Sequence, residues 1–230
     1  MPATLPAHNS PRHIPRLGFG LVAIRESKVP SSELFVALEI LYAGVDVDIT
    51  YKIIKEGVQR LTGENEYMDL FSIHSPNGGK ENRRLIWEVN YGIQHIEEMR
   101  AFATTWLPVV NQIKVLTPIH MHPWCQQRGI VEYCKTNDIT IEAYCPDAPS
   151  KKAHDKTLQC VAEKHTRTPS QVLVRWSLHK GYVSLPKSDD AIEVVTNAQV
   201  FDFNLDEEDM AVLDSLDQGN KGAMVRAVEN

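Results

Sequence analysis

Strand-like and helix-like segments alternate along most of the chain, and this alternation limits the folds open to it most strongly. Repeated strand–helix units of this length predict a parallel sheet built from βαβ units. The units outnumber those of a small flavodoxin-like sheet, so the pattern favours an α/β fold closed into a (β/α) barrel. Strands are expected within residues 13–24, 45–51, 69–76, 85–89, 108–115, 139–146 and 183–188, and helices within 31–44, 92–103, 127–137, 156–165, 169–181 and 205–219.

The first predicted helix, residues 31–44, rests on local signals alone. Leu34, Leu38 and Leu41 recur at helical spacing, a serine precedes them as a candidate cap, and Gly44 follows as a stop. Before these elements, residues 1–13 contain prolines and no periodic pattern. We therefore expect a flexible tail at 1–13 and one barrel domain at 14–230.

Composition excludes several classes of partner. The formal net charge is −6, so the chain has no basic footprint for nucleic acid. No apolar run reaches the length of a membrane span, and the first residues resemble no secretory signal. We expect a cytoplasmic monomer. The four cysteines form no CxxC pair and are interpreted as reduced thiols that fill the core.

Polar residues stand where most of the predicted strands end. In a parallel barrel the carboxyl ends of the strands meet at one mouth, and catalytic groups are found there. The pattern therefore predicts a single site at that mouth. The residues concerned are Asp48, His74, Asn90, Gln112, Tyr144, Lys187 and Ser188.

Several of these residues lie in motifs that resemble the aldo-keto reductases. The resemblance starts at IPRLGFG, continues at LFSIHSP, and is dense from VVNQI through HPWCQQRGIVEYC, PSQVLVRWSL and LPKS to FDFNLDEEDM. The chain is identified as a divergent, shortened member of that family. The resemblance implies a TIM-type barrel, a nicotinamide cofactor (NADP or NAD) and reduction of an aldehyde or ketone to an alcohol.

The family reaction needs a Tyr proton donor, a Lys that lowers its pKa, an Asp that holds the Lys, and a His on the carbonyl. His74 and Asp48 match the family His and Asp. Ile53 stands at the Tyr position, and Tyr51, roughly 7 Å away on the same face of an extended strand, is the nearest stand-in. The Lys has no counterpart, because residues 59–70 run directly into the His74 strand. We expect a barrel that lacks its third strand and the neighbouring helices.

The cofactor-binding positions match the family better. The resemblance assigns Gln112 to the carboxamide, Tyr144 to stacking on the nicotinamide, and the remaining matched positions to the rest of the cofactor. The matched positions are Asn90, Gln112, Tyr144, Lys187, Ser188 and Asn197.

Two positions around the cofactor depart from the family. Val89 replaces a Ser, and Glu193 replaces the Arg that follows the site Lys by six residues. Asp189 and Asp190 add negative charge beside it. A 2′-phosphate prefers Arg and Lys donors, so the sequence predicts little preference for NADPH over NADH.

Two classes of function therefore remain. The chain is either an impaired NAD(P)H-dependent carbonyl reductase or a redox-inactive barrel, including a product of mis-splicing. The missing helices, together with the segment 114–121 that is foreign to the family, favour a mis-spliced gene model whose true product is a full reductase. His120 and His122 form an HxH pair, but no third metal ligand is evident, and we expect no metal site.

Overall fold

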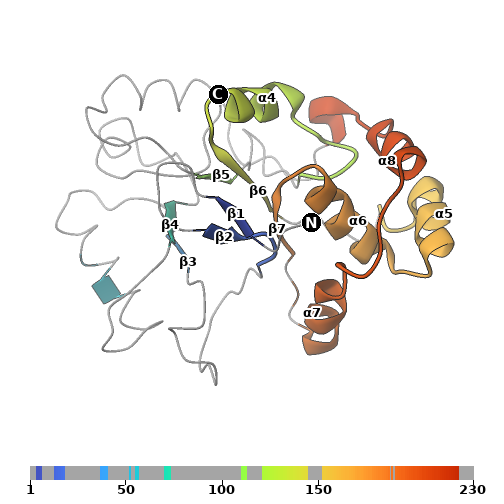
Figure 1. Cartoon of the computed structure of the whole chain (residues 1–230), viewed down its shortest axis with the longest axis horizontal. Coiled ribbons are helices and arrows are strands. Elements are labelled where there is room, and N and C mark those ends of the chain that lie inside the picture. The colour runs from blue at the N-terminus through green and yellow to red at the C-terminus, as the bar shows by residue number, and fades with distance from the viewer. Residues whose placement is uncertain are drawn as a thin grey trace.

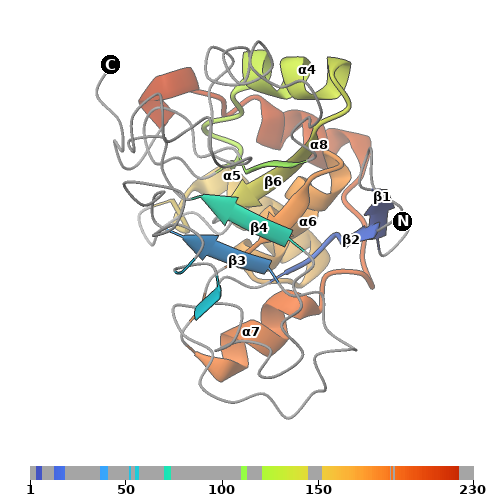
Figure 2. The ribbon, with the colours of Figure 1, turned by 90° about the vertical axis from the view of Figure 1, so that its left-hand side faces the viewer.

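The structure, a computed structural model, describes residues 4–6, 13–18, 37–40, 52, 55–56, 70–73, 110–112, 121–144, 152–186, 188 and 190–222. Three short sheets are present in this part of the chain. One has three parallel strands, one has two parallel strands, and one is an antiparallel pair. Figures 1 and 2 show the helices of the carboxyl-terminal half gathered on one side of the strands.

The three-stranded sheet has the order β5-β6-β7 and is parallel throughout. Its strands are β5 (Val110–Gln112), β6 (Thr140–Tyr144) and β7 (Val183–Leu185). All three lie within segments that the sequence predicts as strands. The connections β5 to β6 and β6 to β7 pass through helices, as parallel neighbours require.

A second parallel pair joins β3 (Ala37–Ile40) to β4 (Leu70–Ile73), with Ala37 opposite Leu70 and Ile40 opposite Ile73. The helix predicted for residues 31–44 is therefore wrong at 37–40. Its leucine spacing is a local signal, whereas β3 exists through pairing with a segment 33 residues further along the chain. Tertiary pairing overrides helix propensity of this size.

A short hairpin lies ahead of the parallel strands. Its strands are β1 (Thr4–Pro6) and β2 (His13–Pro15), paired antiparallel. Leu17, just beyond β2, forms a parallel bridge to Ser184 of β7. Residues 4–6, inside the stretch for which the sequence predicts a tail, are thus part of a sheet.

Five helices follow β5 in the described part of the chain: α4 (Arg128–Thr136), α5 (Lys156–His165), α6 (Pro169–His179), α7 (Ala191–Ala198) and α8 (Glu207–Asp214). The sequence predicted all of them except α7. Four begin at side-chain caps, with Thr168 and Asp206 each closing a capping box. A 3₁₀ turn, η4 (Gly219–Gly222), follows α8.

The main core cluster is formed by side chains of α4, β6, α5, α6 and α8. Every residue of α6 from Gln171 to Leu178 is buried. Trp124 and Trp176 are among the largest fully buried side chains, at 1% and 0% exposure. Cys125 and Cys134 are buried free thiols, as interpreted, whereas Cys160 is exposed and fills no core position.

Candidate functional site

Three of the residues assigned to the cofactor lie at, or just beyond, the ends of neighbouring strands of one parallel sheet. Gln112 is the last residue of β5, Tyr144 is the last residue of β6, and Ser188 lies three residues beyond the end of β7. The register places Gln112 opposite Glu142 and Tyr144 opposite Leu185. The three positions therefore lie along the carboxyl edge of β5-β6-β7, where barrel sites form.

Ser188 and α7 form an acidic turn beyond that edge. The Ser188 hydroxyl donates to Glu193 Oε2 at 2.6 Å and accepts from the Asp190 amide at 3.0 Å. Asp190 caps α7, because its Oδ1 accepts from the amides of Ile192 and Glu193 at 2.7 and 3.4 Å. The Ser188 hydroxyl proton and the first amides of α7 are thus already bound to carboxylates.

Asn197, the last cofactor position in the chain, lies on α7. It is 4% exposed, whereas Ile192 and Val195 of the same helix are 76% and 60% exposed. Asn197 is thus turned inward and α7 presents apolar side chains to solvent.

The remaining site predictions lie outside the described residues. For Gln112 and Tyr144 only the strand positions above are described. The predicted positions outside are Asp48, Tyr51, His74, Asn90 and Lys187, together with Ile53 and Val89.

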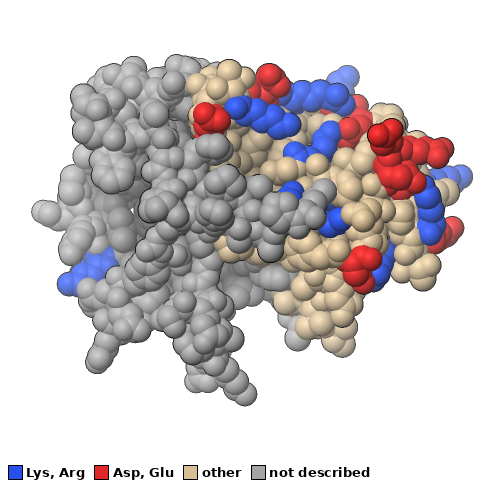
Figure 3. Space-filling model, in the orientation of Figure 1, with Lys and Arg blue, Asp and Glu red and all other residues tan. Residues whose placement is uncertain are grey.

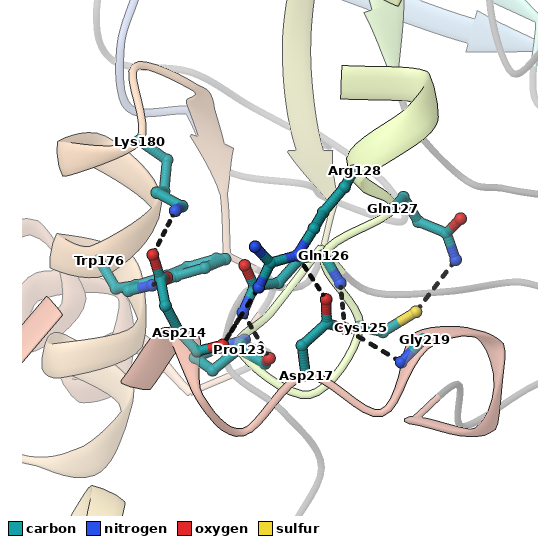
Figure 4. Close-up of polar contacts among 10 residues, drawn as sticks. All are labelled: Pro123, Cys125, Gln126, Gln127, Arg128, Trp176, Lys180, Asp214, Asp217 and Gly219. Atoms are coloured by element: carbon teal, nitrogen blue, oxygen red, sulfur yellow. Dashed lines mark hydrogen bonds and ion pairs between the residues drawn. The ribbon is translucent and has the colours of Figure 1, made fainter. Parts of the chain in front are cut away.

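A polar network joins the loop before α4 to the chain after α8 (Figure 4). Asp217 accepts from Arg128 Nε at 2.8 Å and from the amides of Gln126 and Gly219 at 3.3 and 3.0 Å. The Gln126 side chain donates to the carbonyl of Asp214 at 2.9 Å. The loop of 122–128 and the segment of 214–222 are therefore held together at several points.

Asp214 fastens the same segment to α6. Its carboxylate accepts from Trp176 Nε1 at 2.8 Å and from Lys180 Nζ at 2.6 Å (Figure 4). Burial, and then the negative charge of Asp214, raise the pKa of Tyr182. Tyr182 is therefore a neutral core residue and no candidate acid.

Burial and charge act in opposite directions on Asp217. Burial works to raise the pKa of its carboxyl, but hydrogen bonds from Arg128 and from the Gly219 and Gln126 amides outweigh it and lower the pKa. Burial raises the pKa of the Cys125 thiol, which excludes an activated thiolate there. The network is therefore a structural clamp with no nucleophile of its own.

Glu142 is the buried acid that sequence reasoning missed. It is 5% exposed and lies in the middle of β6, between Gln112 and Val183. The signal was an acidic residue inside the otherwise apolar strand segment ITIEAY. A buried carboxylate beside a predicted cofactor position makes Glu142 a candidate for a second polar group of the site.

Other classes of site receive no support from the described residues. None of their helices is long and apolar enough to cross a membrane, and no group of three metal-binding side chains occurs among them. His122 is buried with its ring edge-on to Trp124, centroids 5.6 Å apart. On the face shown in Figure 3, Lys, Arg, Asp and Glu are interspersed over the described helices.

Comparison with known proteins identifies the family. The aldo/keto reductase family model matches residues 22–218. Glyoxal reductase of Bacillus subtilis is 30% identical over 216 residues, which are 87% of this chain and 74% of that protein. An uncharacterized oxidoreductase of Schizosaccharomyces pombe is 34% identical over 168 residues, 66% of this chain. Those residues are only 57% of the yeast protein, so this chain spans less than two thirds of it.

The fold is shared with solved structures as well. A Gox0644 mutant crystallised in complex with NADPH has a TM-score of 0.80 at 23% identity, over 96% of this chain and 95% of that one. The family match and this shared fold imply a TIM barrel, to which β5-β6-β7 contributes consecutive parallel strands. The chain belongs to the aldo/keto reductase family of oxidoreductases.

Proposed function

We propose that this chain binds a nicotinamide cofactor at the carboxyl edge of its barrel and reduces small aldehydes or ketones slowly. Family membership and the positions of Gln112 and Tyr144 on adjacent strand ends support the binding. Ile53 at the position of the proton donor supports the slow rate. General acid catalysis is worth about 10²–10⁴-fold, and an isoleucine has no proton to give.

When bound, the cofactor supplies the hydride that reduces the carbonyl carbon. The chain has to bind the carbonyl, bring it near the nicotinamide and donate a proton to its oxygen. His74 is the residue proposed to hydrogen-bond the carbonyl oxygen, and Tyr51 is the nearest hydroxyl to replace the missing donor. Without the family Lys, Tyr51 keeps a high pKa and donates its proton poorly.

The adenosine end of the site fits NADH better than NADPH. The carboxylates of Glu193, which binds Ser188, and of Asp190, which caps α7, support this preference, because a 2′-phosphate needs cationic donors. A ribose 2′-hydroxyl, in contrast, donates well to a carboxylate. We therefore propose NADH as the preferred form and Glu193 as the residue that selects it.

A second function is a redox-inactive barrel that binds cofactor or a small molecule without turnover. The absence of a Tyr at position 53 and of a matching Lys favours it. The same features fit a transcript that has lost segments of a full reductase. In either case we propose a cytoplasmic monomer.

Consumption of NADH and NADPH against a panel of aldehydes and ketones tests the proposal. The unmodified chain is compared with His74→Ala, Tyr51→Phe and Ile53→Tyr, and with Tyr133→Phe on α4 as the control. We expect slow turnover that falls with His74→Ala and Tyr51→Phe, rises with Ile53→Tyr, and is unchanged in the control.

Turnover of ordinary enzymatic size that is insensitive to Tyr51→Phe would contradict the assignment of the donor. Cofactor binding without turnover in every variant would favour the redox-inactive barrel. Sequencing the transcript decides separately whether the missing segments belong to the natural protein.

A further inference from the structure

Two arginines and a histidine converge at the carboxyl end of α6. Arg175 and His179 are four residues apart, so they share one face of the helix. Arg16, which follows β2, donates a hydrogen bond through Nη2 to the carbonyl of Leu178 in the same last turn. Arg16 and Arg175 are 5% and 2% exposed. The fold thus buries two guanidinium groups beside one imidazole.

No acid among the described residues forms an ion pair with the cluster, and the charge of Asp202 acts on Arg175 only from a distance. Arg175 donates to the neutral side chain of Asn204, and Arg16 donates to a backbone carbonyl. The Nε atoms of both arginines and Nε2 of His179 have no hydrogen-bond partner. The acid on this side of α6, Asp202, is 60% exposed and pairs with Arg167 at 2.7 Å.

Burial of uncompensated charge is expensive. Removing an unpaired ion from water costs much more free energy than a cation gains from the dipole at a helix carboxyl terminus. The dipole therefore explains the position of Arg16 but cannot offset both arginines. A bound anion would supply the charge that the described side chains do not.

We propose that Arg16, Arg175 and His179 form a binding site for a small tetrahedral oxyanion of the phosphate or sulfate class. The two unpartnered Nε–H groups and the imidazole Nε2 offer three donors when His179 is protonated on that nitrogen. A tetrahedral oxyanion has enough oxygens to accept from all three, and guanidinium groups bind such oxygens well.

This site is separate from the proposed cofactor site. α6 ends at His179 and β7 begins at Val183, so the cluster lies at the amino end of β7. Gln112, Tyr144 and Ser188 lie at the carboxyl ends of the same sheet, and in a barrel these are opposite faces.

Local opening of the β1–β2 hairpin gives an ion access to the cluster. Arg16 follows directly on β2, and each strand of the hairpin has only three residues. A two-stranded hairpin of this size is marginally stable by itself. It can therefore open locally and admit an ion while the sheet of β5-β6-β7 stays folded.

The pKa of His179 indicates whether the oxyanion site is occupied. Burial, and then the charges of Arg175 and Arg16, lower the pKa of its imidazole. A bound oxyanion counters those two charges and raises the pKa. A change in His179 titration separates binding at this cluster from a general effect of salt on stability.

Titration of the full chain with inorganic phosphate, at constant ionic strength set with sodium chloride, tests the site. Thermal unfolding and the NMR titration of His179 are followed in the unmodified chain, Arg16→Met, Arg175→Met and Arg128→Met. Arg128 is the control, because its charge is exposed and paired with Asp217. At a phosphate concentration about a hundred times Kd we expect the midpoint to rise by roughly 5–10 °C.

The rise in the unfolding midpoint should persist in Arg128→Met and disappear in Arg16→Met and Arg175→Met. In the unmodified chain it should accompany an increase in the pKa of His179. Sulfate should act like phosphate and acetate should not. An equal rise in Arg175→Met, or an equal effect of acetate, overturns the assignment. If the cluster variants do not fold, an unchanged His179 titration in the unmodified chain overturns it.

Discussion

Glu193 holds the hydroxyl of Ser188 at 2.6 Å, and this contact limits what the turn before α7 can bind. The carboxylate is a hydrogen-bond acceptor only, so it suits a ribose hydroxyl and repels a phosphate. The Asp190 cap adds a second carboxylate, bound to the first amides of α7. The proposed preference for NADH therefore depends on single residues.

Glu193→Arg should raise the affinity for NADPH about tenfold or more, because a charge-assisted hydrogen bond contributes about 1.5–3 kcal/mol. Affinity for NADH should change little or fall. Fluorescence titration with both cofactors measures this. Glu207→Arg, on the first turn of α8, makes the same charge change elsewhere and serves as the control. Equal gains for both cofactors would refute the role of Glu193.

His179 should make the fold sensitive to mild acid. Burial, then Arg175 and Arg16, depress its folded-state pKa below the ordinary value of 6.5. The unfolded chain therefore takes up the proton first, and stability that is complete above pH 6.5 falls as the pH drops through the folded pKa.

In phosphate-free buffer, His179→Gln should reduce the fall in stability below pH 6.5. His154→Gln, at an exposed position, should leave that fall unchanged. Urea unfolding midpoints measured on both sides of pH 6.5 test the prediction. The same acid dependence in His179→Gln and the unmodified chain would show that another group is responsible.

At the scale of elements, the clamp seen in Figure 4 makes η4 part of the packed body. The Gln218 amide donates to the Trp124 carbonyl at 2.8 Å. Gly222 lies against the same carbonyl, because a Cβ built on Gly222 would be 1.8 Å from that oxygen. Both groups are backbone, so the contact cannot be relieved by rotating a side chain.

Gly222→Ala should therefore lower the free energy of unfolding by about 1–3 kcal/mol, the usual cost of overpacking. Gly129→Ala is the matched control, since a Cβ there meets nothing within 4 Å and the residue lies in α4. The control should be neutral or stabilising by up to about 1 kcal/mol through helix propensity. Urea unfolding measures both, and similar values for the two would contradict the close approach.

For the whole molecule, stability is concentrated around α6. Its residues from Gln171 to Leu178 are buried, and it packs on α5, α7 and β7. Its first turn is closed by the Thr168 capping box, and Asp214, the last residue of α8, binds Lys180 at its other end. The β1–β2 pair, in contrast, is a separate two-stranded sheet.

Amide hydrogen exchange should therefore be slower in α6 than in the β1–β2 hairpin. We expect α6 amides to exchange only through global unfolding and those of β1 and β2 to exchange much faster through local opening. Mass spectrometry of peptic peptides measures the difference. Equal protection of the hairpin and α6 would also remove the proposed entry route to the oxyanion cluster.

The sequence by itself determined the family, the strands β4 to β7 and most of the helices. Their signals are local: a cap such as Asp155 or Thr168 next to apolar residues at helical spacing. The helix predicted across residues 31–44 failed at β3 because strand pairing depends on a distant partner. The proposed roles of Asp48, Tyr51 and His74 stay predictions from the family pattern.

Only the tertiary structure brought Arg16 to the carboxyl end of α6, 162 residues away from its partner Leu178. Only the fold turned Asn197 inward and set Ser188 against Glu193. Pattern and capping depend on residues a few positions apart. Burial and counter-charge, in contrast, depend on which distant segments pack together, and no local pattern in the chain encodes that.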